Sequence, residues 1–345
     1  MYQVVITEKE AGQRFDKYLH RILPNAEKGF LYKMLRKKNI TLNDRKADGS
    51  EKTAEGDSVK IFFAQETLSK FMGKETESGV LSPVGKPPHP LSDYVSAYRK
   101  LADIQVIYEN DHILIADKPP GILSQKADKS DLSLNEWLIG YLLEKGGLSA
   151  EDLSFFRPSV CNRLDRNTSG IVLCAKTLKG AQLLGKLLKE RTLHKYYKLY
   201  VKGALAKERM IEGYLVKDEK RNKAVILKKQ SGNKEQAPEG LAIKTKYRPL
   251  RLETDKTLLE VELITGKTHQ IRAHLASIGH PLLGDYKYGD REWNEDYRQK
   301  YGVRSQLLHA YKVEFPALDA PFFDISGRTF VSQPPEIFAR VSHTC

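Results

Sequence analysis

A nine-residue polar segment, NRLDRNTSG at 162–170, leads directly into the apolar run Ile171–Ala175. The apolar run has the residue types of a strand, and the polar segment is rich in residues that form turns. The pattern predicts a rigid turn that holds Asp165 between Arg163 and Arg166. Two interpretations stay open on these residues alone. The Asp165 side chain can cap the turn, or, kept ionised by neighbouring cations, it can act as an enzymatic nucleophile.

The charge of the chain indicates a polyanionic partner. Lys and Arg number 57 against 44 for Asp and Glu, which gives a formal net charge of +13 over 345 residues. Such an excess attracts nucleic acids or acidic membranes, and salt weakens the attraction. Composition alone does not distinguish RNA, DNA and membrane. The length suffices for one large domain or two.

Secretion, membrane insertion and a cysteine framework are not indicated. The start of the chain, Met1–Leu19, is charged throughout and lacks the apolar core of a signal peptide, and no apolar run is long enough to span a bilayer. The cysteines at 161, 174 and 345 lack the spacing of metal ligands. We therefore expect a cytoplasmic protein without a zinc site, a disulfide scaffold or a membrane partner.

The first segment, residues 1–63, predicts a small α/β domain. A strand-like run at 2–6 precedes two amphipathic helical stretches, and two short strands follow at 40–44 and 57–63. The second helical stretch, 28–38, turns its apolar residues inward and presents a face of cations with no acid among them. These cations are Lys28, Lys33, Arg36, Lys37 and Lys38. Such a face suits structured RNA, whereas the alternative is an ordinary solvated charged surface.

Residues 64–100 are interpreted as a linker, because Gly, Ser and Pro recur there with little hydrophobic rhythm. The third segment, 101–345, is the larger domain. Its predicted strands lie at 112–117, 171–176, 195–202 and 258–264, and its predicted helices at 134–144, 177–190 and 268–278. Strands of mixed spacing with interspersed helices favour an α+β fold with a mixed, largely antiparallel sheet over a doubly wound one.

Two further clusters are candidates to join Asp165 in one site. In KYYKLYVKG at 195–203, Tyr197 lies in a strand surrounded by basic residues, so its ring can pack in the core or stack on an unpaired base. In TGKTHQIRAHL at 265–275, His269 and Arg272 share a helix face. A buried Arg272 needs a carboxylate or phosphate partner, for which Asp165 is a candidate. The alternative is a surface helix with ordinary basic side chains. The loop 279–285 is interpreted as structural.

These motifs, in this order, resemble the RluA-type family of RNA pseudouridine synthases. The matching segments are DKPPG at 117–121, NRLDRNTSG at 162–170, KYYKLYVKG at 195–203, TGKTHQIRAHL at 265–275 and LLHA at 307–310. Residues 11–19 and 31–44 are similar to the ribosomal-protein-S-four-like RNA-binding module that often precedes this catalytic domain. The run DYKYGDREW at 285–293 resembles the RluC branch most, which implies 23S ribosomal RNA as the substrate.

The resemblance implies a pseudouridine synthase fold and an isomerase that converts uridine to pseudouridine in RNA without a cofactor or a metal. It implies Asp165 as the catalytic aspartate, Arg272 as its salt-bridge partner and Tyr197 as the active-site aromatic. One carboxylate can attack the sugar or the base, or act as a base towards the sugar. The family usually has His at 162 and more commonly Arg at 267, where this chain has Asn162 and Lys267. We expect local RNA contacts to differ there.

We expect a monomer that binds ribosomal RNA through cations of both domains. The RNA-binding candidates are Lys33, Arg36, Lys37, Lys38, Arg163 and Arg166. One alternative is the same chemistry on transfer RNA, which the fused basic module and the RluC-like run disfavour. Another is a non-catalytic RNA-binding ribosome-assembly factor, which the intact catalytic set disfavours. A glycosidase normally needs two placed carboxylates, and no second acid is predicted beside Asp165.

Overall fold

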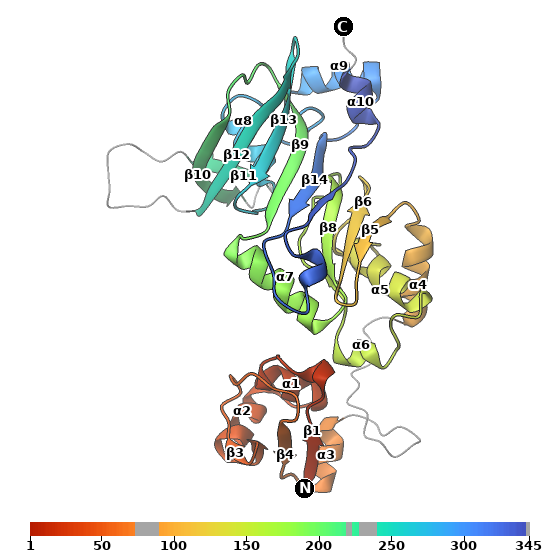
Figure 1. The fold of residues 1–345 in the computed structure, drawn as a ribbon, viewed down its shortest axis with the longest axis vertical. Coiled ribbons are helices and arrows are strands. Elements are labelled where there is room, and N and C mark those ends of the chain that lie inside the picture. The colour runs from red at the N-terminus through yellow and green to blue at the C-terminus, as the bar shows by residue number, and fades with distance from the viewer. Residues whose placement is uncertain (73–89, 219–222, 228–239, 343–345) are drawn as a thin grey trace, which may run out of the picture.

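The computed structural model describes residues 1–72, 90–218, 223–227 and 240–342 (Figure 1). The N-terminal part forms a four-stranded antiparallel sheet of order β1-β4-β2-β3. Helices α1 and α2 bury their apolar faces in one core with this sheet. The elements are β1 (Tyr2–Val5), the 3-10 helix η1 (Glu8–Glu10), α1 (Phe15–Ile22), α2 (Lys28–Arg36), β2 (Ile40–Leu42), β3 (Arg45–Lys46) and β4 (Ser58–Ile61).

The basic helix α2 ends two residues earlier than its sequence predicted. Lys38 adopts the left-handed conformation, with φ of 57°. Its amide donates to the Leu35 carbonyl at 3.1 Å, and the Asn39 amide donates to the Met34 carbonyl at 3.0 Å, so the last carbonyls of the helix are satisfied by a left-handed end. The predicted helical face of five cations is therefore wrong for Lys37 and Lys38, which lie beyond the helix.

The segment 64–100, predicted as a linker, contains a helix at each end. Helix α3 (Gln65–Met72) buries Met72 in the N-terminal core, and α4 (Leu91–Lys100) packs on α5 (Leu134–Glu144). The α4–α5 contact depends on Gly140, where a Cβ atom would lie 2.0 Å from the Tyr94 carbonyl oxygen. The linker prediction misses both helices, and residues 73–89 lie outside the described residues.

The large sheet has eleven strands, of which nine follow the order β11-β10-β12-β13-β9-β14-β8-β6-β5, while β15 pairs with β14 and β7 with β8. Every described pair is antiparallel except β14 with β8. The predicted α+β class with a mixed, largely antiparallel sheet is confirmed. The strands are β5 (Gln105–Glu109), β6 (Ile113–Lys118), β7 (Ser159–Val160), β8 (Ser169–Ala175), β9 (His194–Lys202), β10 (Arg209–Asp218), β11 (Lys223–Leu227), β12 (Leu241–Leu252), β13 (Lys256–Leu263), β14 (Leu308–Glu314) and β15 (Thr329–Val331).

Helices cover both faces of the sheet at β8, whose seven residues are all buried. Val172 and Cys174 share a core with α5, and Ile171 and Leu173 share another with α7 on the opposite face (Figure 1). The remaining helices are α6 (Asp152–Phe155), α7 (Leu178–Glu190), α8 (Gln270–Ser277), α9 (Arg291–Tyr301), η2 (Phe323–Ile325) and α10 (Ile337–Ser342). In the described part of the chain, no helix is both long and apolar enough to cross a membrane.

Candidate active site

The turn that carries Asp165 connects β7 to β8 and is held by its own backbone and by Ser124. The Thr168 amide donates to the Asp165 carbonyl at 3.0 Å, which closes the turn. The Ser124 hydroxyl accepts from the Leu164 amide and donates to the Leu164 carbonyl, each at 3.0 Å. The buried strand β8 follows directly. The side-chain capping interpretation is therefore wrong, because the Asp165 backbone carbonyl closes the turn and the carboxylate stays available.

Lys118, from the DKPPG motif, ties this turn to the end of β6. Its side chain is fully buried, and the ammonium donates to the carbonyls of Pro119 and Ile122 at 2.9 Å and of Arg166 at 3.1 Å. Burial lowers the pKa of Lys118 to about 7, and the Asp165 carboxylate opposes that shift. Because three carbonyls from two chain segments converge on one ammonium, the turn next to Asp165 cannot move without breaking these bonds.

Asn162 and Gly170 fix the two ends of the same turn. The side-chain Oδ1 of Asn162 accepts from the Leu173 amide at 2.7 Å, so this departure from the family pattern serves the backbone of β8. Gly170 has φ of 108°, and a Cβ there would lie 2.2 Å from the Ala310 carbonyl oxygen on β14. Only glycine permits this approach.

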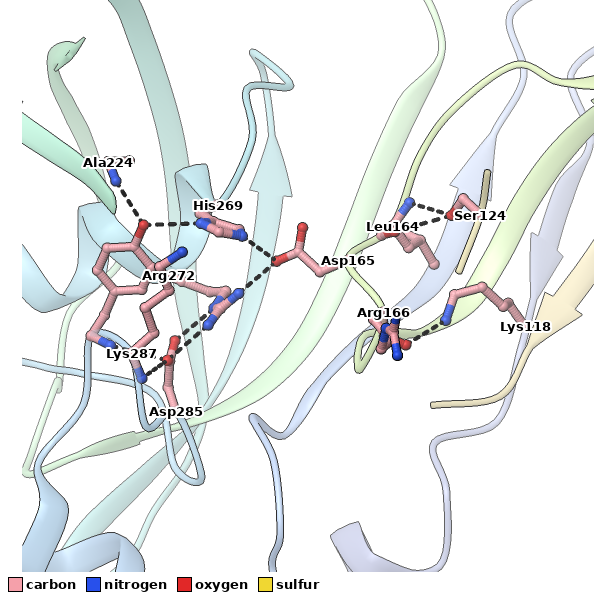
Figure 2. A network of polar contacts seen from close by, with 11 residues as sticks. Lys118, Ser124, Leu164, Asp165, Arg166, Ala224, His269, Arg272, Asp285 and Lys287 are labelled. Carbon is pink, nitrogen blue, oxygen red and sulfur yellow. Dashed lines mark hydrogen bonds and ion pairs between the residues drawn. The ribbon is translucent and has the colours of Figure 1, made fainter. Parts of the chain in front are cut away.

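The predicted ion pair between Asp165 and Arg272 is present (Figure 2). Arg272 projects from α8, is 7% exposed, and donates from Nη1 to Asp165 Oδ2 at 2.8 Å. Its pKa is raised, because the stabilising contacts with Asp285 and Asp165 outweigh its burial. The alternative of a surface helix with solvated cations is excluded for Arg272.

A second carboxylate, Asp285, completes the arrangement, and the sequence reasoning missed it. Asp285 is fully buried and binds Arg272 through two hydrogen bonds, Nε to Oδ2 at 2.7 Å and Nη2 to Oδ1 at 2.9 Å. Its Oδ1 also accepts from the amides of Lys287 and Tyr288 at 2.9 and 3.1 Å. The loop 279–285 was interpreted as merely structural, yet its last residue orients the guanidinium that holds Asp165. A guanidinium has five N–H donors, and a single carboxylate cannot accept from all of them. A buried Arg272 therefore already indicated a second acceptor besides Asp165.

Asp285 does not make the site a glycosidase pair. Arg272 lies between the two carboxylates, and Asp285 has no exposed surface, whereas the Asp165 side chain is 24% exposed. A general acid must reach the leaving oxygen of the substrate. Asp285 is therefore a positioning residue for Arg272, and Asp165 is the accessible carboxylate of this pair.

His269 approaches Asp165 from the residue before α8, so the prediction that it shares a helix face with Arg272 is wrong. It precedes α8 in the left-handed conformation, with φ of 56°, and its Nε2 lies 3.8 Å from Asp165 Oδ2. Its Nδ1 lies 3.0 Å from the Tyr288 hydroxyl, which accepts from the Ala224 amide at 2.8 Å. The Tyr288 hydrogen is then free to point at Nδ1, which leaves the imidazole proton on Nε2, towards Asp165. Burial lowers the pKa of His269, which favours this neutral form.

Tyr197 lies on β9 inside the main core, where its side chain is 5% exposed. Its pKa is raised, first by burial and then by the charge of Asp165, so the phenol stays protonated beside the carboxylate. Among the described residues, its hydroxyl has no hydrogen-bond partner. The packing interpretation is confirmed for the ring, and the stacking role on a base stays a prediction.

The structure brings only part of the predicted RNA-binding set to this site. Arg163 and Arg166 are exposed on either side of Asp165, and Arg166 lies 4.0 Å from Asp131. The other four cations are exposed on the N-terminal unit, away from the large sheet (Figure 1): Lys33, Arg36, Lys37 and Lys38. That unit contacts the larger domain through α7, where Glu8 pairs with Lys179 at 2.8 Å.

The arrangement leaves one carboxylate oxygen available for chemistry. Asp165 Oδ2 is held by Arg272, while Oδ1 accepts no hydrogen bond from the described residues (Figure 2). An ionised carboxylate fixed by a guanidinium, with a free and accessible oxygen, can attack an electrophilic carbon or take a proton.

Known proteins share both the sequence and the fold of this chain. A family model described as RNA pseudouridylate synthase matches residues 112–277. The ribosomal large subunit pseudouridine synthase C of Vibrio cholerae is 31% identical over 90% of this chain and 87% of its own length. The protein of the same name from Escherichia coli is 29% identical over 90% of this chain and 88% of its own length.

A solved structure agrees with these sequence similarities. Human RNA pseudouridylate synthase domain containing 4 superposes with a TM-score of 0.55 at 20% identity, over 72% of this chain and 95% of that protein, which shows a shared fold. The family model also includes Asp165, Tyr197 and Arg272 within its matched range. As the RluA-type motifs predicted, this chain belongs to the RNA pseudouridylate synthase family.

Proposed function

We propose that this enzyme converts specific uridines to pseudouridine in large-subunit ribosomal RNA, with Asp165 as the catalytic group. The substrate class rests on the relatives named above, which match nearly the whole chain. The catalytic assignment rests on one observation: Asp165 is held through Oδ2 by the Asp285-anchored Arg272, and its Oδ1 is free.

The reaction is an isomerisation that one carboxylate can support. The N1–C1′ bond of uridine breaks, the base turns, and a C5–C1′ bond forms, while C5 loses a proton and N1 gains one. Atoms and electrons balance without an oxidant or a hydrolytic water. Asp165 acts as the nucleophile at the sugar or the base, or as the base towards the sugar, and Arg272 keeps it ionised and aimed.

The target uridine must leave its stack to reach Asp165, at a cost of a few kcal/mol. Tyr197, whose pKa the charge of Asp165 raises, offers an aromatic ring that can compensate for part of this loss by stacking. Its raised pKa keeps a neutral hydroxyl in the site, which can bond to a base edge.

The N-terminal unit, with the exposed cations of α2 and the residues after it, is our proposed RNA-binding domain of the ribosomal-protein-S-four-like type. Reversing Lys33, Arg36 and Lys37 to Glu is expected to weaken RNA binding about 10- to 100-fold and to reduce the slope of log affinity against log salt by about two to three. Filter binding at several salt concentrations measures both values.

A control triple reversal separates position from net charge. Lys17, Lys52 and Lys70 are exposed cations of the same N-terminal unit, and changing them to Glu alters the total charge equally. We expect the control to keep most of the affinity and slope. Equal losses in the two triple variants would contradict a specific RNA surface at α2.

The function itself is tested by mapping pseudouridines in ribosomal and transfer RNA from cells with and without this protein. We expect particular large-subunit sites to lose pseudouridine in its absence and to regain it with the wild-type protein. Sites lost only from transfer RNA would overturn the substrate assignment, and no lost site in any RNA would overturn the enzyme assignment.

A further inference from the structure

A cavity of about 190 Å³ borders the Asp165 turn. Asn167 and Ser169, which follow Asp165 in the turn, form one wall. Most of the remaining lining comes from the chain after α9, at 302–308, and from α10. The volume is large enough for one flat heterocycle.

Polar groups without partners line this cavity. Gln306 is 7% exposed, and its side-chain amide has no hydrogen-bond partner among the described residues. The Asn167 amide likewise has none there. A ligand in the cavity can therefore complete the hydrogen bonds of both side chains.

Cations and apolar side chains frame the same cavity. Arg304 and Arg340 are exposed at its lining, and within the described ranges neither has an ion-pair partner. Leu308, Ile337 and Phe338 add an apolar surface. Amides that can donate and accept, two free guanidiniums and an apolar wall are together the groups that recognise a base with its phosphate.

The position of the cavity restricts which nucleotide can occupy it. Asn167 is two residues after Asp165, so their Cα atoms are at most about 7 Å apart. Neighbouring bases along one strand are separated by about 3.4 Å when stacked and by more when unstacked. A strand whose uridine reaches Asp165 can therefore place an adjacent or next-adjacent nucleotide in the cavity.

We propose that this cavity binds the base of a nucleotide flanking the target uridine, and that it contributes to the choice of uridine. Gln306 and Asn167 bond to the edge of that base, and Arg304 and Arg340 hold its phosphates. This inference rests on the proposed function, because it assumes an RNA strand that threads past Asp165.

The variant Gln306→Leu separates recognition from folding. Leucine has a similar size and needs no hydrogen bond, so the free energy of unfolding should stay equal or rise. The loss of base contacts should lower kcat/KM about 10- to 100-fold on RNA that contains the mapped uridine. A purely structural Gln306 would instead lower the melting temperature and the activity together.

Single-base deletions in the substrate identify the bound nucleotide. In a series of RNA fragments, each flanking position in turn carries an abasic ribose, and the wild-type enzyme and Gln306→Leu are compared on each. At one flanking position we expect the two enzymes to become equal, because the contact is already absent, while they differ at all other positions. An unchanged difference at every position, or no effect of Gln306→Leu on intact RNA, would overturn the proposal.

The arginines are tested with a matched control on a neighbouring helix. Arg304→Gln and Arg340→Gln should each raise KM and reduce the salt slope by about one. Arg298 on α9 is 58% exposed and pairs with Glu295 rather than lining the cavity, so Arg298→Gln should change neither. If the wild-type enzyme forms no pseudouridine, the proposed function is contradicted. If the wild type is active and the cavity variants have the same activity as the wild type, only this inference is overturned.

Discussion

Asp165→Asn should abolish pseudouridine formation and leave RNA affinity close to that of the wild type. The amide keeps the shape of the side chain and can still accept from Arg272, but it is neither a nucleophile nor a base. Loss of a group that forms the reactive centre lowers the rate on the order of 10⁴-fold or more. Tritium release from C5-labelled RNA measures turnover, and filter binding of the same RNA measures affinity.

Asp131→Asn is the matched control for Asp165. Asp131 lies beside the same turn, 4.0 Å from Arg166, and its Oδ2 accepts from the amides of Ala127 and Asp128. Asparagine preserves an acceptor for those amides, so activity should remain near that of the wild type. Turnover that survives in Asp165→Asn would remove Asp165 from its proposed role and return it to turn formation alone.

Asp285→Ala is expected to destabilise the protein by about 3–5 kcal/mol, because it removes the main partner of a buried guanidinium. Arg272 loses its two bonds to Asp285 and keeps the single bond to Asp165. Without its anchor Arg272 no longer fixes Asp165, so kcat should fall strongly in any fraction that stays folded. Urea unfolding and single-turnover rates measure the two effects separately.

The double variant Arg272→Met, Asp285→Leu distinguishes stability from catalysis. Replacing a buried ion pair by apolar side chains of similar volume is often neutral or stabilising. The double variant should therefore recover part of the free energy of unfolding, because the Lys287 and Tyr288 amides still lose their acceptor. It should remain inactive, since Asp165 has lost its cation. Recovery of both stability and turnover would show that Arg272 and Asp285 serve folding only.

Sequence patterns predicted those elements that are determined by their own residues. The predicted bounds of α5, Leu134–Glu144, agree with the structure, and Ser133 caps it by accepting from the Asn135 amide. The stripe of apolar residues likewise predicted α7, with Thr177 as its N-cap. Periodicity and caps depend on residues close together in the chain, so the sequence alone predicts them. The end of α2 depends on the left-handed conformation of Lys38, which the amphipathic pattern did not indicate.

The candidate site was predictable as far as its motifs contain the reacting groups. Asp165, Arg272 and Tyr197 were proposed from the family resemblance, and the structure brings all three together. Asp285 was missed because its importance arises only when α8 and the loop before α9 meet, 13 residues apart in sequence. Gln306 belongs to none of the motifs, and its place in the cavity lining without a hydrogen-bond partner among the described residues follows only from the structure.

The pairing of one guanidinium with two carboxylates also affects which part of a nucleotide can approach Asp165. Asp165, Asp285 and Arg272 together carry a formal charge of −1, at the centre of a protein with a net charge of +13. A phosphodiester that approached this centre would be repelled, whereas the uncharged base and ribose would not. We therefore expect the RNA backbone to lie on the cationic surroundings and the neutral nucleoside to approach Asp165.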